Sequence, residues 1–140
     1  MSDYILPEVW ENPTSMGGAW GGLNQPTAGA RFEQTLPKGD QPFQLYTLPT
    51  PNGIKATIML EELKELGVTQ AGYDAYRIKI GDGDQFGSDF VSINPNSKIP
   101  AMMDYSEDQP VRVFESANIL LYLAEKFGKL IPTDYAKRTE

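Results

Sequence analysis

Hydrophobic and polar residues follow no sustained period over the first 42 positions, and the pattern becomes regular from Phe43 onward. Residues 43–48 alternate as a strand does, and both faces of this strand are fairly apolar. Residues 50–67 recur at helical spacing, with an apolar stripe formed by Ala56, Met59, Leu60, Leu63 and Leu66. Charged residues take the opposite face, and Gly67 is a natural C-terminal cap. The pattern therefore predicts a strand followed by an amphipathic helix.

The next segments predict a further strand and a hairpin. Residues 75–80 alternate as a strand does, and a strand, helix and strand unit of this length implies parallel pairing with a right-handed crossover. Residues 81–98 are rich in glycine, aspartate and asparagine, and they predict a loop with one helical turn. Residues 101–105 and 111–114 predict two short strands, because the polar run between them is typical of a hairpin turn.

A densely apolar segment, residues 116–127, predicts a second helix, which we expect to be mostly buried and to end at Gly128. The succession of strand, helix, strand, loop, two strands and helix predicts an α/β fold. In this fold, helices flank a four-stranded mixed sheet. Residues 1–42 are rich in proline and glycine, and they predict an irregular N-terminal arm on the surface.

The expected domain therefore covers residues 43–131. Residues 132–140 contain a threonine and an aspartate that suit a helix cap. A helix this short is stable only when it packs on something else. We expect these last residues to be the start of a truncated helical domain.

Composition narrows the possible chemistry. The 140 residues carry a net charge of −7, which disfavours nucleic acid as a partner, because the phosphate backbone binds clustered lysine and arginine. No apolar run approaches the ~20 residues that span a bilayer, and we expect a cytoplasmic protein. The sequence has no cysteine and no histidine, which excludes disulfides, thiolate metal sites and a cysteine nucleophile. A calcium loop beginning at Asp82 fails, because Phe86 and Ile93 fall where oxygen ligands are needed, and we expect no metal.

The junction between the first strand and the first helix is a candidate anion site. Pro51 suits the first helical position, and the Thr50 hydroxyl can cap the helix. Unpaired backbone N–H groups at a helix start stabilise an anion placed beside them. Because the chain has no cysteine, a thiolate used at this position must arrive with a small molecule. The alternative is that Thr50 caps the helix and does nothing more.

A second helix start combines a carboxylate with a hydroxyl. At Glu115 and Ser116 a ligand carboxylate could bind the serine and the backbone, while the glutamate takes an adjacent ammonium group. The alternative is an ordinary serine cap beside an acid that compensates the helix dipole. Pro100 occupies the first residue of a predicted strand, and a cis bond after Ile99 would turn the backbone of Ile99 toward Thr50.

Three segments together resemble the N-terminal thioredoxin-fold domain of the glutathione transferases, most closely the bacterial nu class. They are residues 45–53, residues 94–100, and Glu115 with Ser116. The similarity runs from residues 24–26 in the arm to residues 136–138, and so covers nearly the whole chain. The resemblance implies a thioredoxin-like βαβ-ββα domain. In this family an all-helical second domain follows, of which only the first residues are present here.

The resemblance also implies which residues would hold glutathione. Glu115 and Ser116 would bind its γ-glutamyl end. Ile99, before a cis Pro100, would pair with the cysteinyl backbone, and Lys98 would meet the glycyl carboxylate.

The same resemblance implies how the glutathione sulfur would be held. Thr50, with Asn52 nearby, would donate a hydrogen bond to the sulfur, and Asn24 of the arm would close over it. Thr50 would act as a donor rather than a base, because nothing in this sequence could take its proton. A helix N-terminus and a hydroxyl donor lower the pKa of a thiol from its ordinary value near ~8.5, so the ligand would supply the nucleophile.

The implied function is glutathione-dependent transfer, with disulfide-bond reduction and peroxide reduction prominent. Each site would hold two glutathione molecules or one glutathione disulfide, used as co-substrate with a small disulfide, hydroperoxide or electrophile, in a homodimer. Two other hypotheses stay open. One is a non-catalytic transferase-like module for binding or regulation. The other is a fragment without independent function, which would expose apolar surface on its final helix.

Overall fold

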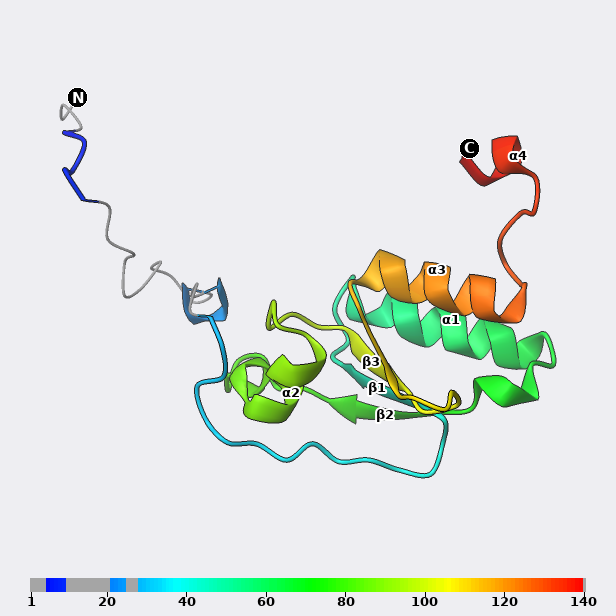
Figure 1. Cartoon of the computed structure of the whole chain (residues 1–140), viewed down its shortest axis with the longest axis horizontal. Helices are drawn as coiled ribbons and strands as arrows, with labels where there is room; N and C mark the ends of the chain where they lie inside the picture. The colour runs from blue at the N-terminus through cyan, green and yellow to red at the C-terminus, as the bar shows by residue number, and fades with distance from the viewer. Residues whose placement is uncertain (1–4, 10–20, 25–27, 140) are drawn as a thin grey trace.

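A four-stranded sheet forms the centre of the chain in the computed structural model, which describes residues 5–9, 21–24 and 28–139 (Figure 1). The strands are β1 (Phe43–Thr47), β2 (Tyr73–Arg77), β3 (Ala101–Asp104) and β4 (Val111–Phe114), and their spatial order is β2-β1-β3-β4. β1 pairs parallel with β2 and antiparallel with β3, which in turn pairs antiparallel with β4. The predicted α/β fold with a four-stranded mixed sheet is confirmed.

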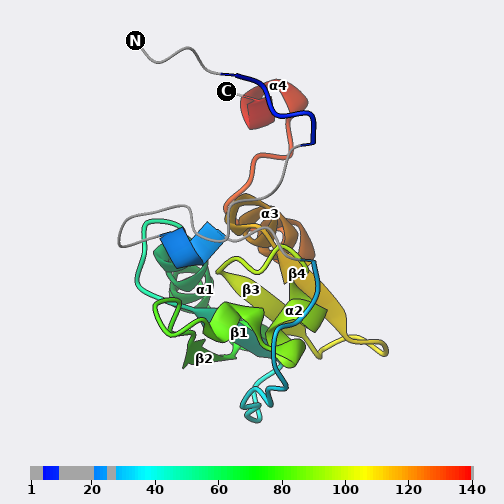
Figure 2. The same cartoon turned by 90° about the vertical axis from the view of Figure 1, so that its left-hand side faces the viewer.

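Helices flank this sheet. α1 (Gly53–Glu65) and α3 (Ser116–Phe127) lie side by side (Figure 2) and share one core with the sheet, while α2 (Ser88–Ile93) contributes to a second core. Short 3-10 helices and a last helix complete the described elements: η1 (Gly21–Asn24), η2 (Thr69–Ala71), η3 (Asp84–Phe86) and α4 (Tyr135–Thr139). Among the described residues, no helix is long and apolar enough to cross a membrane.

The two cores lie on opposite faces of the sheet, because neighbouring strand residues point to opposite sides. Met102 of β3 is fully buried in the first core, among the residues of α1 and α3. Its neighbour Met103 packs against the second core, with Phe90 and Ile93 of α2. The sheet is therefore covered on both sides, as the apolar character of both faces of the first strand predicts.

The expectation that the second helix is mostly buried is wrong. On α3 the buried residues are Ile119, Leu123 and Ala124, whereas Leu121 is 41% exposed. The helix packs on the sheet and on α1 through one stripe only. On the opposite face, Leu121 joins neither core of the described residues, and the exposed Glu125 pairs with Arg138 of α4. A purely sequence-based count of apolar residues cannot distinguish the two faces.

The second strand begins and ends earlier than predicted. Residues 75–80 were expected, but β2 pairs with β1 from Phe43↔Tyr73 to Thr47↔Arg77 and stops where β1 stops. The Ile78 N–H donates one further bond to the Thr47 carbonyl at 2.8 Å. Ile78 is only 2% exposed because it packs in the second core. The apolar alternation beyond β2 thus reflects burial rather than strand pairing.

The described part of the N-terminal arm is irregular but tied to the domain. Residues 31–41, here called the strap, run along α2 and the sheet. The Gln34 N–H donates to Ser88 Oγ at 2.9 Å, and the Leu36 N–H donates to Asp89 Oδ2 at 2.8 Å. The Gln34 side chain also donates to the Asp84 carbonyl at 3.0 Å. One isolated parallel bridge, Phe32↔Gly87, and these side-chain hydrogen bonds hold the segment in place, without a continuous strand ladder.

A buried carboxylate at the end of β3 holds α3 to the sheet. Asp104 is 0% exposed, its Oδ2 accepts a hydrogen bond from the Tyr122 hydroxyl at 2.6 Å, and it pairs with Lys126 at 3.0 Å. Lys126 also pairs with the exposed Glu107. Burial alone would raise the pKa of Asp104, but hydrogen bonds from Tyr122, Ser106 and Lys126 outweigh it and lower the pKa.

Candidate glutathione site

The strand register brings the three sequence segments singled out above to one end of the sheet. Tyr46 of β1 pairs with Ala101 of β3, and Ala101 pairs with Phe114 of β4. The loop that leaves β1, the loop that enters β3 and the turn that leaves β4 therefore emerge together. Thr50, Ile99 and Glu115 lie on these three connections.

Thr50 caps the first helix, although the regular helix α1 begins at Gly53, later than predicted. Its Oγ1 accepts a hydrogen bond from the Gly53 N–H at 3.1 Å, and its carbonyl accepts from the Ile54 N–H at 3.0 Å. Asn52, which directly precedes the helix, makes no side-chain cap and instead accepts a bond from Lys55 at 3.0 Å. Within the described residues the Thr50 hydroxyl proton has no acceptor, so it is available to a ligand.

The close approach of α1 to the end of β1 requires a glycine that sequence reasoning missed. A Cβ on Gly53 would collide with the Leu48 carbonyl oxygen and lie 2.6 Å from Thr47 Oγ1. The signal was present in the sequence, because glycine is otherwise unfavourable in the first turns of a helix.

We expect Gly53→Ala to lower the free energy of unfolding by about 1–3 kcal/mol, because the helix start must move away from β1. Urea denaturation measures this change. Gly81→Ala is the matched control, since a Cβ at Gly81 meets nothing within 4 Å, and it should leave stability nearly unchanged. Equal stability of the two variants would contradict the packing argument.

The loop that enters β3 is organised by Asn94, a second residue whose role sequence reasoning missed. Asn94 is 0% exposed, its Nδ2 donates to the Lys98 carbonyl at 2.6 Å, and its Oδ1 accepts from the Asn96 N–H at 3.0 Å. The Asn-Pro pair that follows α2 is a turn signal that could have indicated this role. The peptide bond between Ile99 and Pro100 is cis, as the resemblance implies.

The start of α3 differs from an ordinary serine cap. Glu115, not Ser116, occupies the cap position, and its carbonyl accepts the Ile119 N–H at 2.9 Å. No side chain caps this helix, and Ser116 Oγ has no hydrogen-bond partner among the described residues. The first-turn N–H groups and the serine hydroxyl can therefore receive a ligand carboxylate.

Glu115 also adopts an unusual backbone conformation. Its φ of 70° and ψ of 122° lie in a region that non-glycine residues rarely occupy, at a cost of about 1–3 kcal/mol. Its exposed carboxylate lies 3.5 Å from Asn96 Nδ2 of the neighbouring loop, a long contact. Strained residues of this kind cluster at functional sites, which favours the ligand-binding interpretation of Glu115 over the simple helix cap.

Lys98 connects this region to the arm. Its Nζ donates to the Leu23 carbonyl in η1 at 3.2 Å, so η1 lies beside the loop that carries Ile99. The backbone of Asn24 ends η1, but its side chain lies outside the described residues. No group of three or more aspartate or glutamate residues that could hold a metal ion occurs in the described ranges.

These features identify a protein class once known proteins are compared. The sequence pattern described as glutathione S-transferase, N-terminal domain, matches residues 51–126, and the chain belongs to this family. The disulfide-bond oxidoreductase YghU of Escherichia coli K12 is 62% identical over 137 residues, which make up 98% of this chain and 48% of that relative. The family resemblance drawn from three sequence segments is confirmed.

Solved structures of glutathione transferases also match this chain. A crystal structure of glutathione transferase YghU from Streptococcus pneumoniae, complexed with glutathione, is 65% identical with a TM-score of 0.91, and the match covers 97% of this chain and 52% of that one. A glutathione transferase from Pseudomonas putida, with one glutathione disulfide bound per subunit, is 43% identical with a TM-score of 0.65, covering 74% and 43%. The chain spans about half the length of these relatives.

Proposed function

We propose that this chain is the glutathione-binding part of a nu-class glutathione transferase that reduces small disulfides and hydroperoxides. The observation that carries this proposal is the Ser116 hydroxyl, which has no hydrogen-bond partner among the described residues. It lies beside the strained Glu115, at the same sheet end as Thr50. In the proposal, Glu115 and Ser116 bind the γ-glutamyl end, and Ile99 before Pro100 pairs with the cysteinyl backbone. The relatives' bound glutathione and glutathione disulfide support the choice of ligand.

The remaining contacts belong to the same proposal. Lys98 meets the glycyl carboxylate, and η1 with Asn24 closes over the ligand. Thr50 donates its hydroxyl proton to the sulfur, with Asn52 nearby. We also propose that residues 43–131 form the glutathione-binding domain and residues 132–140 begin a helical domain, in a cytoplasmic homodimer.

The chemistry uses thiols that the substrate brings, since the chain has no cysteine. A first glutathione thiolate attacks one sulfur of the small disulfide, which breaks the S–S bond and releases one thiolate. A second glutathione thiolate then attacks the glutathione sulfur of the mixed disulfide and releases the second thiolate. Two glutathione molecules are oxidised to one glutathione disulfide, and the substrate disulfide is reduced to two thiols.

The test is turnover of 2-hydroxyethyl disulfide with glutathione by the full-length protein. We expect Thr50→Ala to lower kcat/KM by about ten- to a hundredfold, because the thiolate loses a hydrogen-bond donor. The pH profile should shift upward, since the bound thiol would regain a higher pKa. Thr69→Ala, at the start of η2 and away from this sheet end, should leave the rate unchanged.

A rate that is unaffected by Thr50→Ala would contradict the role of this residue. A protein that binds glutathione disulfide but shows no turnover above background would instead be the non-catalytic binding or regulatory module.

A further inference from the structure

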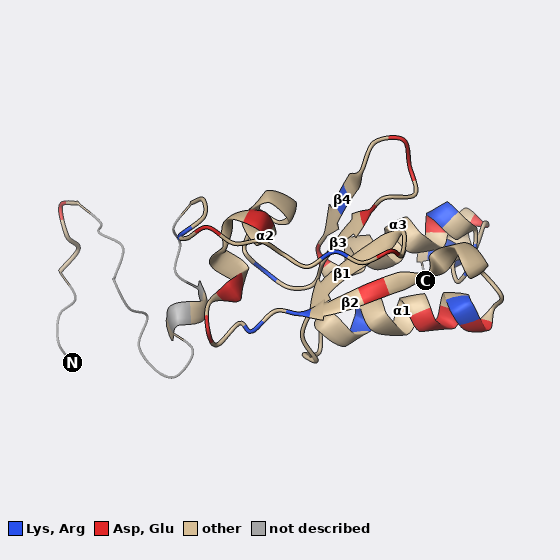
Figure 3. Ribbon diagram, turned by 90° about the horizontal axis from the view of Figure 1, so that it is seen from below, with Lys and Arg blue, Asp and Glu red and all other residues tan. Residues whose placement is uncertain are grey.

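A cavity on the face of the sheet that carries α2 lies apart from the candidate glutathione site. Its volume is about 470 Å³, within the range of ~300–1,000 Å³ that is typical of small-molecule sites. α2 has six residues and lies toward one end of the sheet (Figure 3), so a hollow remains between α2, the strap and the β3–β4 hairpin. None of the residues that line it belongs to the candidate glutathione site.

The walls of the cavity are fixed by hydrogen bonds. The Leu36 N–H donates to Asp89 Oδ2 at 2.8 Å, and the Tyr46 hydroxyl donates to the Pro37 carbonyl at 2.9 Å. Burial, aided by nearby Tyr105, Tyr76 and Asp89, raises the pKa of Tyr46 to about 12, so its hydroxyl keeps its proton. The first bond holds the strap against α2 and the second holds it against the sheet. A preformed cavity of this kind binds a ligand at a smaller entropic cost.

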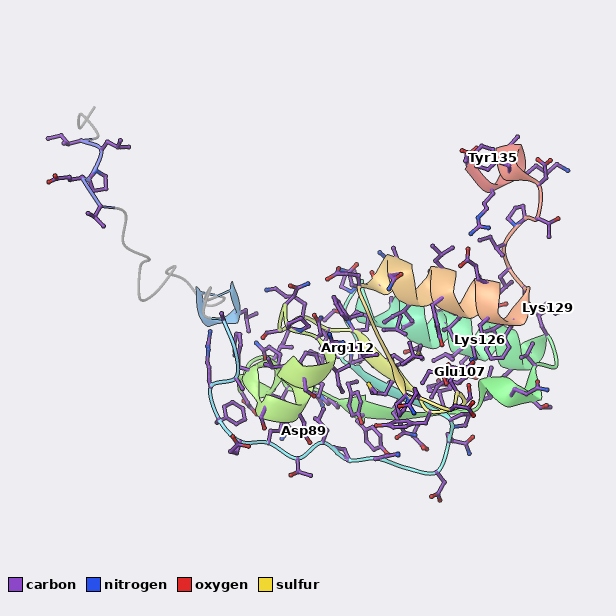
Figure 4. All side chains as sticks on the ribbon, viewed as in Figure 1. Asp89, Glu107, Arg112, Lys126, Lys129 and Tyr135 are labelled. Carbon is purple, nitrogen blue, oxygen red and sulfur yellow. The ribbon has the colours of Figure 1, made fainter. Side chains whose placement is uncertain are left out.

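The lining combines an apolar floor with two cations. Leu36, Ile93 and Met103 supply apolar surface. The Lys38 ammonium lies 3.6 Å from the centre of the Tyr105 ring. Arg112 of β4, labelled in Figure 4, donates through Nη1 to the Ser92 carbonyl at 2.9 Å. Its other nitrogens have no hydrogen-bond partner among the described residues and can donate to a ligand.

The charge of this lining is opposite to that of the chain. Lys38 and Arg112 bring two positive charges, and Asp89, whose Oδ2 already accepts the Leu36 N–H, brings one negative charge. The lining is therefore net positive in a chain of net charge −7. One uncompensated positive charge beside an apolar floor suits a monoanion with an apolar body, while Asp89 disfavours a polyanion.

We propose that this cavity binds a small aromatic carboxylate. The ring lies on Met103 and Ile93, and the carboxylate lies between Lys38 and Arg112, where the free guanidinium nitrogens make charge-assisted hydrogen bonds. This binding is independent of glutathione.

The test uses 2-naphthoate and protein carrying ¹³C-methyl methionine. Met103 lines the cavity, whereas its neighbour Met102 points into the other core and serves as an internal control. We expect the Met103 methyl resonance to shift saturably with 2-naphthoate and the Met102 resonance to stay in place. The neutral 2-naphthalenemethanol should bind at least about tenfold more weakly. No saturable shift of Met103, or equal binding of the two compounds, would overturn the proposal.

A matched pair of variants tests the role of the cation. Arg112→Gln should weaken 2-naphthoate binding about tenfold or more, whereas Arg77→Gln, an equal charge change on β2 outside the cavity, should not. Both variants should keep the stabilisation by glutathione disulfide, which shows that they are folded. Equal affinity of the two variants for 2-naphthoate would overturn the assignment.

Discussion

Replacement of Glu115 by glycine is expected to stabilise the free protein and to abolish its stabilisation by glutathione disulfide. Glycine removes a backbone strain that costs the folded state about 1–3 kcal/mol. It also increases the conformational entropy of the unfolded chain, which lowers stability by about 0.4–1 kcal/mol. The net gain in the free energy of unfolding is therefore at most about 2.6 kcal/mol, with a middle value of about 1 kcal/mol. The same change removes the carboxylate proposed to hold the ligand's ammonium group. Thermal melting with and without the ligand measures both effects.

The size of the lost stabilisation is set by mass action. A ligand at a hundred times its dissociation constant stabilises the folded state by about 2.7 kcal/mol, and this amount should disappear in Glu115→Gly. Ser116→Ala should lose it as well, without the gain in intrinsic stability. Glu65→Ala, at the exposed end of α1, is the control. Its melting temperature should rise with glutathione disulfide by as much as that of the wild type. An undiminished response in both site variants would mean that the ligand binds elsewhere.

Asp104→Asn is expected to lower the free energy of unfolding by about 2–3 kcal/mol. The change removes the buried charge that pairs with Lys126 at 3.0 Å and accepts the Tyr122 hydroxyl at 2.6 Å. Losing one partner of a buried pair typically costs about 3–5 kcal/mol, but Lys126 keeps its contact with the exposed Glu107, which reduces the effect. Chemical denaturation at neutral pH measures the difference.

The pair of Asp104 and Lys126 predicts that stability depends on pH. The pKa of Asp104 is lower in the folded state than in the unfolded state, so its contribution to the free energy of unfolding is complete above the unfolded pKa of ~3.9. This contribution is lost as the pH falls through the folded pKa. The difference in the free energy of unfolding between wild type and Asp104→Asn should therefore become smaller in acid. Asp108→Asn, in the exposed hairpin turn, should show neither the loss of stability nor the narrowing.

Much of the fold follows from short-range pattern. The apolar stripe of α1, the polar turn between β3 and β4, and the glycine that ends α3 each specify local structure without reference to distant residues. Gly128 indeed takes the left-handed conformation that such a cap requires, with φ of 60°. These elements could be predicted because their causes lie within a few positions in the chain.

The errors occur where distant residues decide. β2 ends at Arg77 because its partner β1 ends at Thr47, and nothing near Ile78 in the sequence reveals this limit. The strap depends on Gln34 meeting Ser88, a pair 54 positions apart. The exposed face of α3 is equally invisible, since a helix's pattern of apolar residues does not show which of them have a partner.

The residues of the candidate site also differ in how well the sequence indicates them. Thr50, Glu115 and Ser116 were accessible to sequence reasoning because helix starts have recognisable residue preferences. Gly53 and Asn94 left only weak signals, a glycine in a first helical turn and an Asn-Pro pair, because their importance comes from a backbone oxygen or carbonyl that only the folded loop brings close. The residues that line the cavity beside the strap come from five separate stretches of the chain, and no local motif indicates it.

The order of strands in the sheet has a consequence for how the protein is made. The connections that carry Thr50, Ile99 and Glu115 meet only when β3 lies between β1 and β4. Because synthesis proceeds from the N-terminus, the segment around Glu115 is the last of the three to leave the ribosome. A nascent chain released before α3 is complete would carry Thr50 and Ile99 without the third connection of the proposed site. If glutathione binds as proposed, it can stabilise this domain only after the segment around Glu115 has left the ribosome.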